Sequence, residues 1–176
     1  MFKKYFFIIF ILSTIYGLDK IYTEHFDSFY IENLDSYTTE VNVSVGELHF
    51  NPINLNGQNY IELSIQNSYP SKKIGSPNLP MLNQMIEIPR GGSIRIEMIE
   101  DDIEIYNGSN YNMNSFIVPV QPSAPKSGAL NNFVINQGIY DSNLFFKNSL
   151  VEVLEKGLMR EVRIANLMIS PIEYNP

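Results

Sequence analysis

The feature that most constrains the fold is a repeated alternation of apolar and polar residues. At positions 60–65 the isoleucines and the leucine fall on one side of an extended chain, and polar residues fall on the other. The same period of two occurs at positions 37–45, from Val41 onward, and at positions 93–100. This period is typical of a strand with one face in the core and one in water. These segments therefore predict half-buried β-strands.

Shorter apolar runs add further expected strands at Met85–Ile88, Ile103–Tyr106, Phe116–Val120, Val151–Leu154 and Glu161–Ile169. Turn-forming residues separate the strands at Asn51-Pro52, Asn56-Gly57, Pro70–Pro80, Pro89–Gly92 and Asn107-Gly108, the last suited to a type I′ turn. Short strands punctuated in this way predict an all-β fold, an antiparallel β-sandwich of jelly-roll type. At most one short helix is expected, and Asn143–Leu154 could carry a short turn.

The first seventeen residues have the composition of an export signal. Lys3 and Lys4 precede an apolar run from Tyr5 to Ile15. That run is shorter than the roughly 20 residues that a membrane-spanning helix needs. We expect residues 1–17 to be a signal peptide, 18–36 an N-terminal segment and 37–176 one domain. An uncleaved anchor is the alternative, and both place the domain outside the cytoplasm. After signal cleavage the protein is expected to be secreted, periplasmic or at the cell surface, without membrane contact.

The chain carries few of the residues that catalysis requires. It has no cysteine, which excludes a thiol nucleophile, a cysteine zinc site and disulfides. His25 and His49 are isolated from each other, and no serine lies in a Gly-x-Ser-x-Gly turn. The acidic run from Glu100 to Glu104 lacks the spacing and the glycine of a calcium loop, so a solvated turn is expected there. The sequence therefore predicts no enzyme, no cofactor and no metal site.

The net charge is -7, and no cluster of Lys and Arg offsets it. Such a surface repels phosphate backbones, so nucleic acid is not an expected partner.

The loop from Pro119 to Leu130 is the most informative candidate for a binding site. Three prolines, at 119, 122 and 125, keep it extended and out of a central sheet. Lys126 stands among small neighbours within it. An extended segment with one exposed basic side chain is the shape that a peptidase binds. An ordinary solvated lysine is the plain alternative, and Lys72-Lys73 is a second, weaker candidate of the same kind.

Several motifs occur in a fixed order along the chain. They are Gly75-Ser76-Pro77-Asn78-Leu79-Pro80, then Met85–Pro89 with Gly91-Gly92, then Pro119–Pro122, Asn136–Tyr140, Arg160–Arg163 and the ending Pro171–Pro176. The ordered set covers residues 37–176 and resembles the N-terminal propeptides of gingipain-type cysteine peptidases.

The resemblance implies a non-catalytic prodomain that assists folding of a cysteine peptidase and keeps it latent. In that family a loop lies across the active-site cleft, and its basic residue enters the pocket that selects Arg or Lys. Carried over, this position falls on or near Lys126, and the expected inhibitory loop is Gln121, Pro122, Pro125, Lys126 and Ser127. The implied partner is a gingipain-type cysteine peptidase domain, in cis or in trans.

The chain departs from the family at its end, Tyr174-Asn175-Pro176, where the family usually continues through another strand into the peptidase. We expect a prodomain without its last strand, from either a truncated frame or a protein that acts on a separate peptidase. The alternative function is a secreted β-sandwich that binds glycans or cell-surface partners. The absence of Trp counts against it, because such modules usually display aromatic platforms.

Overall fold

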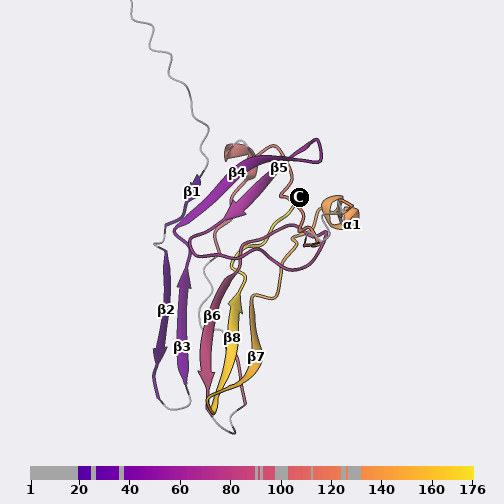
Figure 1. Cartoon of the computed structure of the whole chain (residues 1–176). Helices are drawn as coiled ribbons and strands as arrows, with labels where there is room; N and C mark the ends of the chain where they lie inside the picture. The colour runs from indigo at the N-terminus through magenta and orange to yellow at the C-terminus, as the bar shows by residue number, and fades with distance from the viewer. Residues whose placement is uncertain are drawn as a thin grey trace, which may run out of the picture.

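Antiparallel sheets account for most of the regular structure (Figure 1). The computed structural model describes residues 20–24, 27–35, 38–89, 91, 93–97, 103–111, 113–123, 126 and 132–176. Its strands are β1 (Lys20–Tyr22), β2 (Ser28–Asn33), β3 (Thr39–Ser44), β4 (Glu47–Leu55), β5 (Gln58–Ser64), β6 (Leu82–Ile88), β7 (Val151–Met159) and β8 (Val162–Ile169). Within the described residues they form sheets in the orders β1-β4-β5, β2-β3 and β6-β8-β7. The expected all-β class is confirmed.

Two of these sheets lie side by side in the lower half of the molecule (Figure 1). The β2-β3 hairpin directs Phe29, Val41 and Val43 toward a buried cluster of Ile65, Leu82, Leu167 and Ile169. Three of those four residues belong to β6 and β8. Contact between the apolar faces of two antiparallel sheets is the packing expected of a sandwich.

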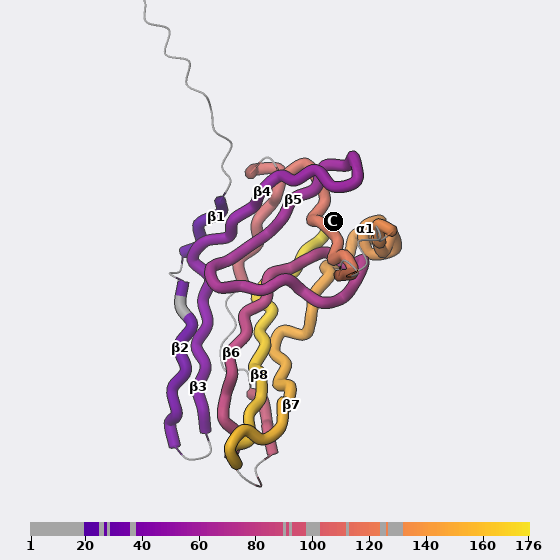
Figure 2. The backbone as a smooth tube through the Cα atoms, viewed as in Figure 1, coloured from indigo at the N-terminus to yellow at the C-terminus, as the bar shows by residue number. Residues whose placement is uncertain are grey.

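The sheet β1-β4-β5 covers a second buried cluster in the upper half, formed by Ile21, Phe50, Ile61, Leu63, Leu79 and Ile117. Leu48 and Ile172 pack against both clusters, so the two cores are continuous. The C-terminus also lies in this half, where Tyr174 packs against the upper cluster (Figure 2).

The β4-β5 hairpin turns at Asn56-Gly57, as expected. Asn56 has φ 54° and Gly57 has φ 80°, and Leu55 pairs with Gln58 across the turn. Two successive residues with positive φ form the type I′ turn that matches the twist of the flanking strands.

The expectation of a turn at Asn51-Pro52 is wrong, because Pro52 lies within β4 opposite Ile61. The N–H of Ile61 donates to the carbonyl of Phe116, and its carbonyl accepts from the N–H of Val118, both at 2.9 Å. Both groups of Ile61 thus point away from β4, so this pair requires no N–H from the proline.

The expected strand at Phe116–Val120 is extended but forms only isolated bridges, from Ile117 to Ile61 and from Pro119 to Pro77. The prolines at 77 and 119 have no N–H to donate, so a continuous ladder cannot form there. The segment instead connects β5 with the loop at residues 75–78.

Two other expected strands are wrong where the structure describes them. Residues 93–97 and 103–106 have no strand pairing, and residues 98–100 lie outside the described residues. The Asn107-Gly108 pair opens a 3-10 helix, η1 (Gly108–Tyr111), instead of a type I′ turn. In the Pro89–Gly92 reversal Gly91 has φ 74°, but residues 90 and 92 are not described.

The one short helix allowed for is α1 (Gln137–Tyr140), which precedes the segment where a short turn was expected, and β7 begins at Val151 within that segment. The β7-β8 hairpin turns at Arg160 (φ 49°) and Glu161 (φ 72°), and Gly157 (φ 118°) lies at a bulge in β7. The strands expected at 151–154 and 161–169 are thus confirmed, the first extended to Met159.

Candidate functional site

The two ends of the predicted loop are joined by the side chain of Gln121. Its Nε2 donates to the carbonyl of Val134 at 2.8 Å, and the N–H of Val134 donates to its Oε1 at 3.0 Å. The same Nε2 lies 3.1 Å from the carbonyl of Pro119. The side-chain amide of Gln121 thus both donates a hydrogen bond to the backbone of Val134 and accepts one from it. We call Gly75, Gln121 and Val134 the neck of the loop.

Gly75 forms backbone hydrogen bonds to the segment that enters the loop and to the segment that leaves it. Its N–H donates to the carbonyl of Val120, and its carbonyl accepts from the N–H of Asn136, each at 2.8 Å. Gly75 has φ +79°, and a Cβ built there would lie 3.2 Å from the nitrogen of Asn136 and 3.3 Å from Cγ1 of Val134. Both the conformation and the close approach require glycine.

The neck rests on fully buried residues that follow Gly75. Ser76 and Leu79 are 0% exposed, and Pro77 is also among the most buried residues. The N–H of Asn78 donates to the carbonyl of Val118, and the N–H of Val120 donates to the carbonyl of Ser76, both at 2.9 Å. The buried motif Gly75–Pro80 therefore supports the base of the loop through these hydrogen bonds.

The predicted loop residues occupy two different environments. Gln121 and Pro122 are half-buried at the neck, whereas Lys126 is exposed at a turn. Pro125 and Ser127 lie outside the described residues. The structure therefore assigns Gln121 to the base of the loop and leaves Lys126 accessible.

The second basic candidate, Lys72-Lys73, has partners on the surface of the domain. Lys72 Nζ lies 3.8 Å from Sδ of Met168, and Lys73 Nζ lies 5.7 Å from the ring centre of Phe146. Both lysines line a hollow of about 240 Å³ together with Met81, Asn148, Ser149, Glu152, Met168 and Ser170. Both lysines are exposed, as Lys126 is, but these contacts hold them against the surface of their own domain.

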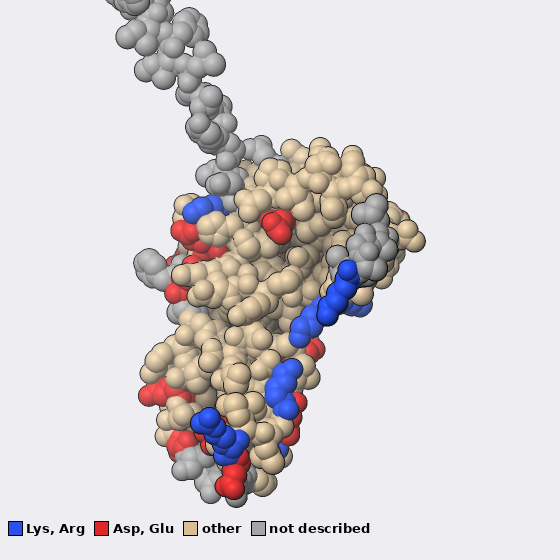
Figure 3. All heavy atoms as spheres, in the orientation of Figure 1, with Lys and Arg blue, Asp and Glu red and all other residues tan. Residues whose placement is uncertain are grey.

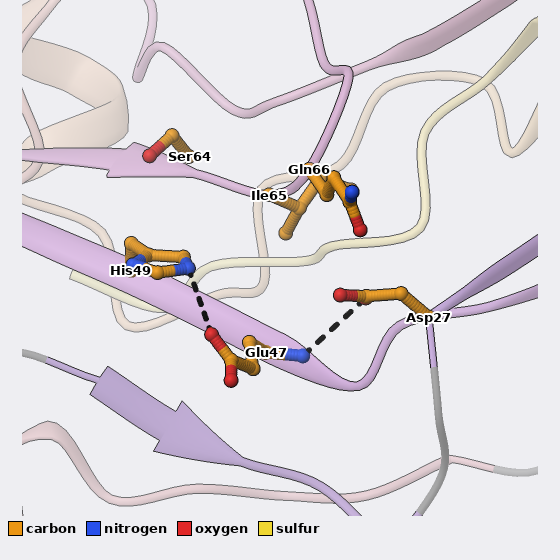
Figure 4. A pocket seen from close by; sticks show the side chains of 6 residues that line it. All are labelled: Asp27, Glu47, His49, Ser64, Ile65 and Gln66. Atoms are coloured by element: carbon orange, nitrogen blue, oxygen red, sulfur yellow. Dashed lines mark hydrogen bonds and ion pairs between the residues drawn. The ribbon is translucent and has the colours of Figure 1, made fainter.

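His49 lies in a second hollow of about 460 Å³ (Figure 4). Its Nε2 is 3.1 Å from Oε2 of Glu47, and that oxygen also lies 3.2 Å from Nζ of Lys20. Asp27 accepts the N–H of Gly46 at 2.7 Å with its carboxylate. The close-up shows Ser64 apart from the histidine, with no hydrogen bond drawn between them (Figure 4). The arrangement fits a charge pair at the surface rather than an activated nucleophile.

His25 and residues 100–102 of the acidic run lie outside the described residues. Glu104 is described, and its carboxylate accepts hydrogen bonds from the hydroxyl of Tyr106 and from the N–H of Glu24. Burial, together with this bond to Glu104, raises the pKa of Tyr106 to about 12. Among the described residues, no three His, Cys, Asp or Glu side chains are grouped so that they could hold a metal ion.

Charges are unevenly distributed on the face seen in Figure 3. Acidic and basic residues gather toward the edges and the lower half, and the area over β4 and β5 is mostly uncharged but includes an acidic side chain (Figure 3). In the part of the chain that the structure describes, no helix is long and apolar enough to cross a membrane.

Comparison with known proteins decides the family, because the model named Propeptide_C25 matches residues 27–176. The chain belongs to the Propeptide_C25 family. As a member of that family it is a propeptide domain, and not an enzyme. The resemblance inferred from the ordered motifs is therefore confirmed.

The curated relatives are Lys-gingipains. Lys-gingipain of Porphyromonas gingivalis is 28% identical over 138 residues, which cover 77% of this chain and 8% of that protein. Lys-gingipain W83 from the same species matches equally well. The chain thus spans a small part of the length of the curated relatives that it matches.

Two solved structures have the same fold. One, described as structural insight into zymogenic latency of gingipain K from Porphyromonas gingivalis, superposes with a TM-score of 0.83 at 26% identity, covering 89% of this chain and 87% of that one. The other is a complex of Porphyromonas gingivalis RgpB pro- and mature domains, with a TM-score of 0.67 at 17% identity, covering 84% and 74%.

Proposed function

We propose that this propeptide domain holds a gingipain-type cysteine peptidase latent by placing Lys126 in the pocket that selects a basic residue. The observation that carries the proposal is the contrast within the loop. Lys126 is exposed at a turn, whereas the loop ends are fastened through Gln121, Val134 and Gly75. A pre-organised loop gives up less conformational entropy on binding than a free peptide does.

The similarity to propeptides supports a peptidase as the partner, in cis or in trans. The solved relatives include a complex of pro- and mature domains and a structure concerned with zymogenic latency. By analogy this domain also assists folding of the peptidase. The glycan-binding alternative has less support, because among the described residues neither Phe nor Tyr lines either hollow described above.

An inhibition assay tests the role of Lys126. The purified protein is titrated against gingipain K of Porphyromonas gingivalis, and the inhibition constant is compared with that of Lys126→Ala. Loss of a charged group from a desolvated pocket weakens binding by at least roughly thirtyfold. Lys72→Ala is the matched control, and its inhibition constant is expected to stay near that of the unaltered protein. Equal inhibition by Lys126→Ala would contradict the proposal.

Lys126→Arg tests whether the pocket is the site of contact. Because Arg and Lys differ in shape and hydrogen bonding, the exchange should favour an Arg-selective peptidase over a Lys-selective one. Unchanged selectivity would place the basic side chain outside the pocket.

We further propose that residues 1–17 are a signal peptide and that the protein acts outside the cytoplasm. Mass spectrometry of the exported protein should then give Leu18 as its first residue. Retention of residues 1–17 would instead favour the anchor.

A further inference from the structure

We propose that the neck makes the loop an inhibitor rather than a substrate, because it holds both sides of the Lys126–Ser127 bond whether that bond is intact or cut. This inference rests on the proposed function, which puts Lys126 in the pocket of a peptidase. A peptidase that binds a basic side chain in this way cleaves the bond that follows it. The inference concerns what keeps the cleaved loop in place.

The neck bonds lie on both sides of this bond along the chain. On the N-terminal side Val120 is bonded to Gly75, and on the C-terminal side Asn136 is bonded to the same glycine. The amide of Gln121 connects directly to Val134, thirteen residues further on. These four hydrogen bonds are all 3.0 Å or shorter. None of them involves residues 122–133, so a cut after Lys126 removes none of them.

Each side of the neck also leads directly into the core. The segment before it contains Ile117, which is 1% exposed. The segment after it enters α1, where the hydroxyl of Tyr140 donates to the carbonyl of Ile117 at 2.8 Å. Since Tyr140 is itself 3% exposed, a buried hydrogen bond joins the segment before the loop to the segment after it. Separation of the two sides therefore requires disruption of the core.

Cleavage adds one water molecule across the peptide bond and leaves a carboxylate on Lys126 and an amino group on Ser127. In an ordinary substrate the two product ends then diffuse apart. Here the neck keeps them in one molecule at a high effective concentration. The cut loop can stay in the cleft, and the carboxylate and amine can rejoin with loss of the same water. Without the neck bonds, the two cut ends would move independently of each other and leave the cleft, although the core would still hold the two segments in one molecule.

The test follows cleavage and inhibition together. Gln121→Met keeps the length of the side chain but removes both hydrogen bonds to Val134. With gingipain K in excess, mass spectrometry gives the rate of cleavage after Lys126, and a parallel assay gives the inhibition constants of intact and cut protein. The unaltered protein is expected to lose less than about threefold in inhibition when it is cut. Gln121→Met should be cleaved roughly tenfold faster, and its cut form should lose inhibition.

Two further variants test whether loss of the hydrogen bonds to Val134 causes the faster cleavage and the loss of inhibition. Gln121→Glu sets a carboxylate oxygen against the carbonyl of Val134 and should act in the same direction, which covers the case that Gln121→Met does not fold. Gln84→Met, an exposed position on β6, is the matched control and should behave as the unaltered protein. Thermal melting of each variant shows that it is folded.

The outcomes distinguish this inference from the proposed function. If Lys126→Ala abolishes inhibition, but both Gln121 variants are cleaved and inhibit as the unaltered protein does, the role of the neck is wrong. If Lys126→Ala inhibits normally, the proposed function fails before the neck is tested.

Discussion

The hydroxyl of Tyr140 donates a hydrogen bond to the carbonyl of Ile117, and the two oxygens are 2.8 Å apart. The ring of Tyr140 also meets the ring of Phe116 edge-on, with centres 5.5 Å apart. The backbone N–H of Ile117 bonds to Tyr174, whose pKa is raised by burial and partly lowered again by that bond. Two tyrosines from the last forty residues thus satisfy both backbone groups of Ile117, which β5 leaves unpaired.

Tyr140→Phe should lower the free energy of unfolding by about 1–3 kcal/mol, because it leaves the buried carbonyl of Ile117 without a donor. Urea unfolding measures this difference. Tyr22→Phe is the control, since Tyr22 is 61% exposed and should change stability by less than about 0.5 kcal/mol. Equal effects of the two substitutions would contradict the role of the hydrogen bond.

Stability should fall as the pH rises from about 10 to about 12. Burial raises the pKa of Tyr106 from 10.0 to about 12, and the pKa of Tyr140 and Tyr174 is raised in the same direction. In this window the unfolded chain has lost phenolic protons that the folded chain keeps, so alkali favours unfolding. Urea unfolding at several pH values measures the slope, and absorbance at 295 nm follows tyrosine ionisation. Tyr106→Phe should make the slope shallower, and an unchanged slope would contradict this assignment.

Arg160→Asn should stabilise the domain by about 0.5–1 kcal/mol, because Asn tolerates the left-handed conformation better than Arg does. Arg160 has φ 49° at the first position of the β7-β8 turn. Arg160→Gln removes the same charge but keeps the conformational cost, so it should give no gain. Thermal melting compares the two variants. If both were equally stabilised, the charge and not the backbone would be responsible.

Leu79→Ala should destabilise the domain by about 2–5 kcal/mol, because Leu79 is 0% exposed and its loss leaves a cavity beneath the neck. Leu158→Ala is the matched control, since Leu158 is 71% exposed. Denaturant unfolding of both variants checks the difference. A small effect at position 79 would show that the buried cluster closes easily around the gap.

The alternating pattern correctly predicted strands that pair in a sheet, but the same prediction was wrong for described segments that have no neighbouring strand to pair with. The pattern at 60–65 lies in a sheet, with Ile61 and Leu63 buried. The same pattern at 93–97 leaves Ile96 49% exposed, and Ile105 in the next expected strand is 81% exposed. Alternation tells which face of a strand would be buried, but pairing depends on an edge contributed by distant sequence.

In the loop, too, some features can be predicted from neighbouring residues, and others depend on residues far away in the sequence. Lys126 was identified from its small neighbours and from the family resemblance, and the structure describes it as exposed. The role of Gln121 at the neck could not be predicted, because its partner Val134 is thirteen residues away in sequence. The backbone geometry of Gly75 could not be predicted beyond its place in a motif, because a positive φ and a close backbone approach leave no local signature other than glycine itself.

Leu48 from β4 and Ile172 from the segment after β8 each pack against both hydrophobic clusters, although they are far apart in the sequence. Neither core is complete until Ile172 has joined it. Contacts between such distant positions slow folding, because a large loop must close before they form. The domain should therefore fold in one cooperative step that includes the base of the loop.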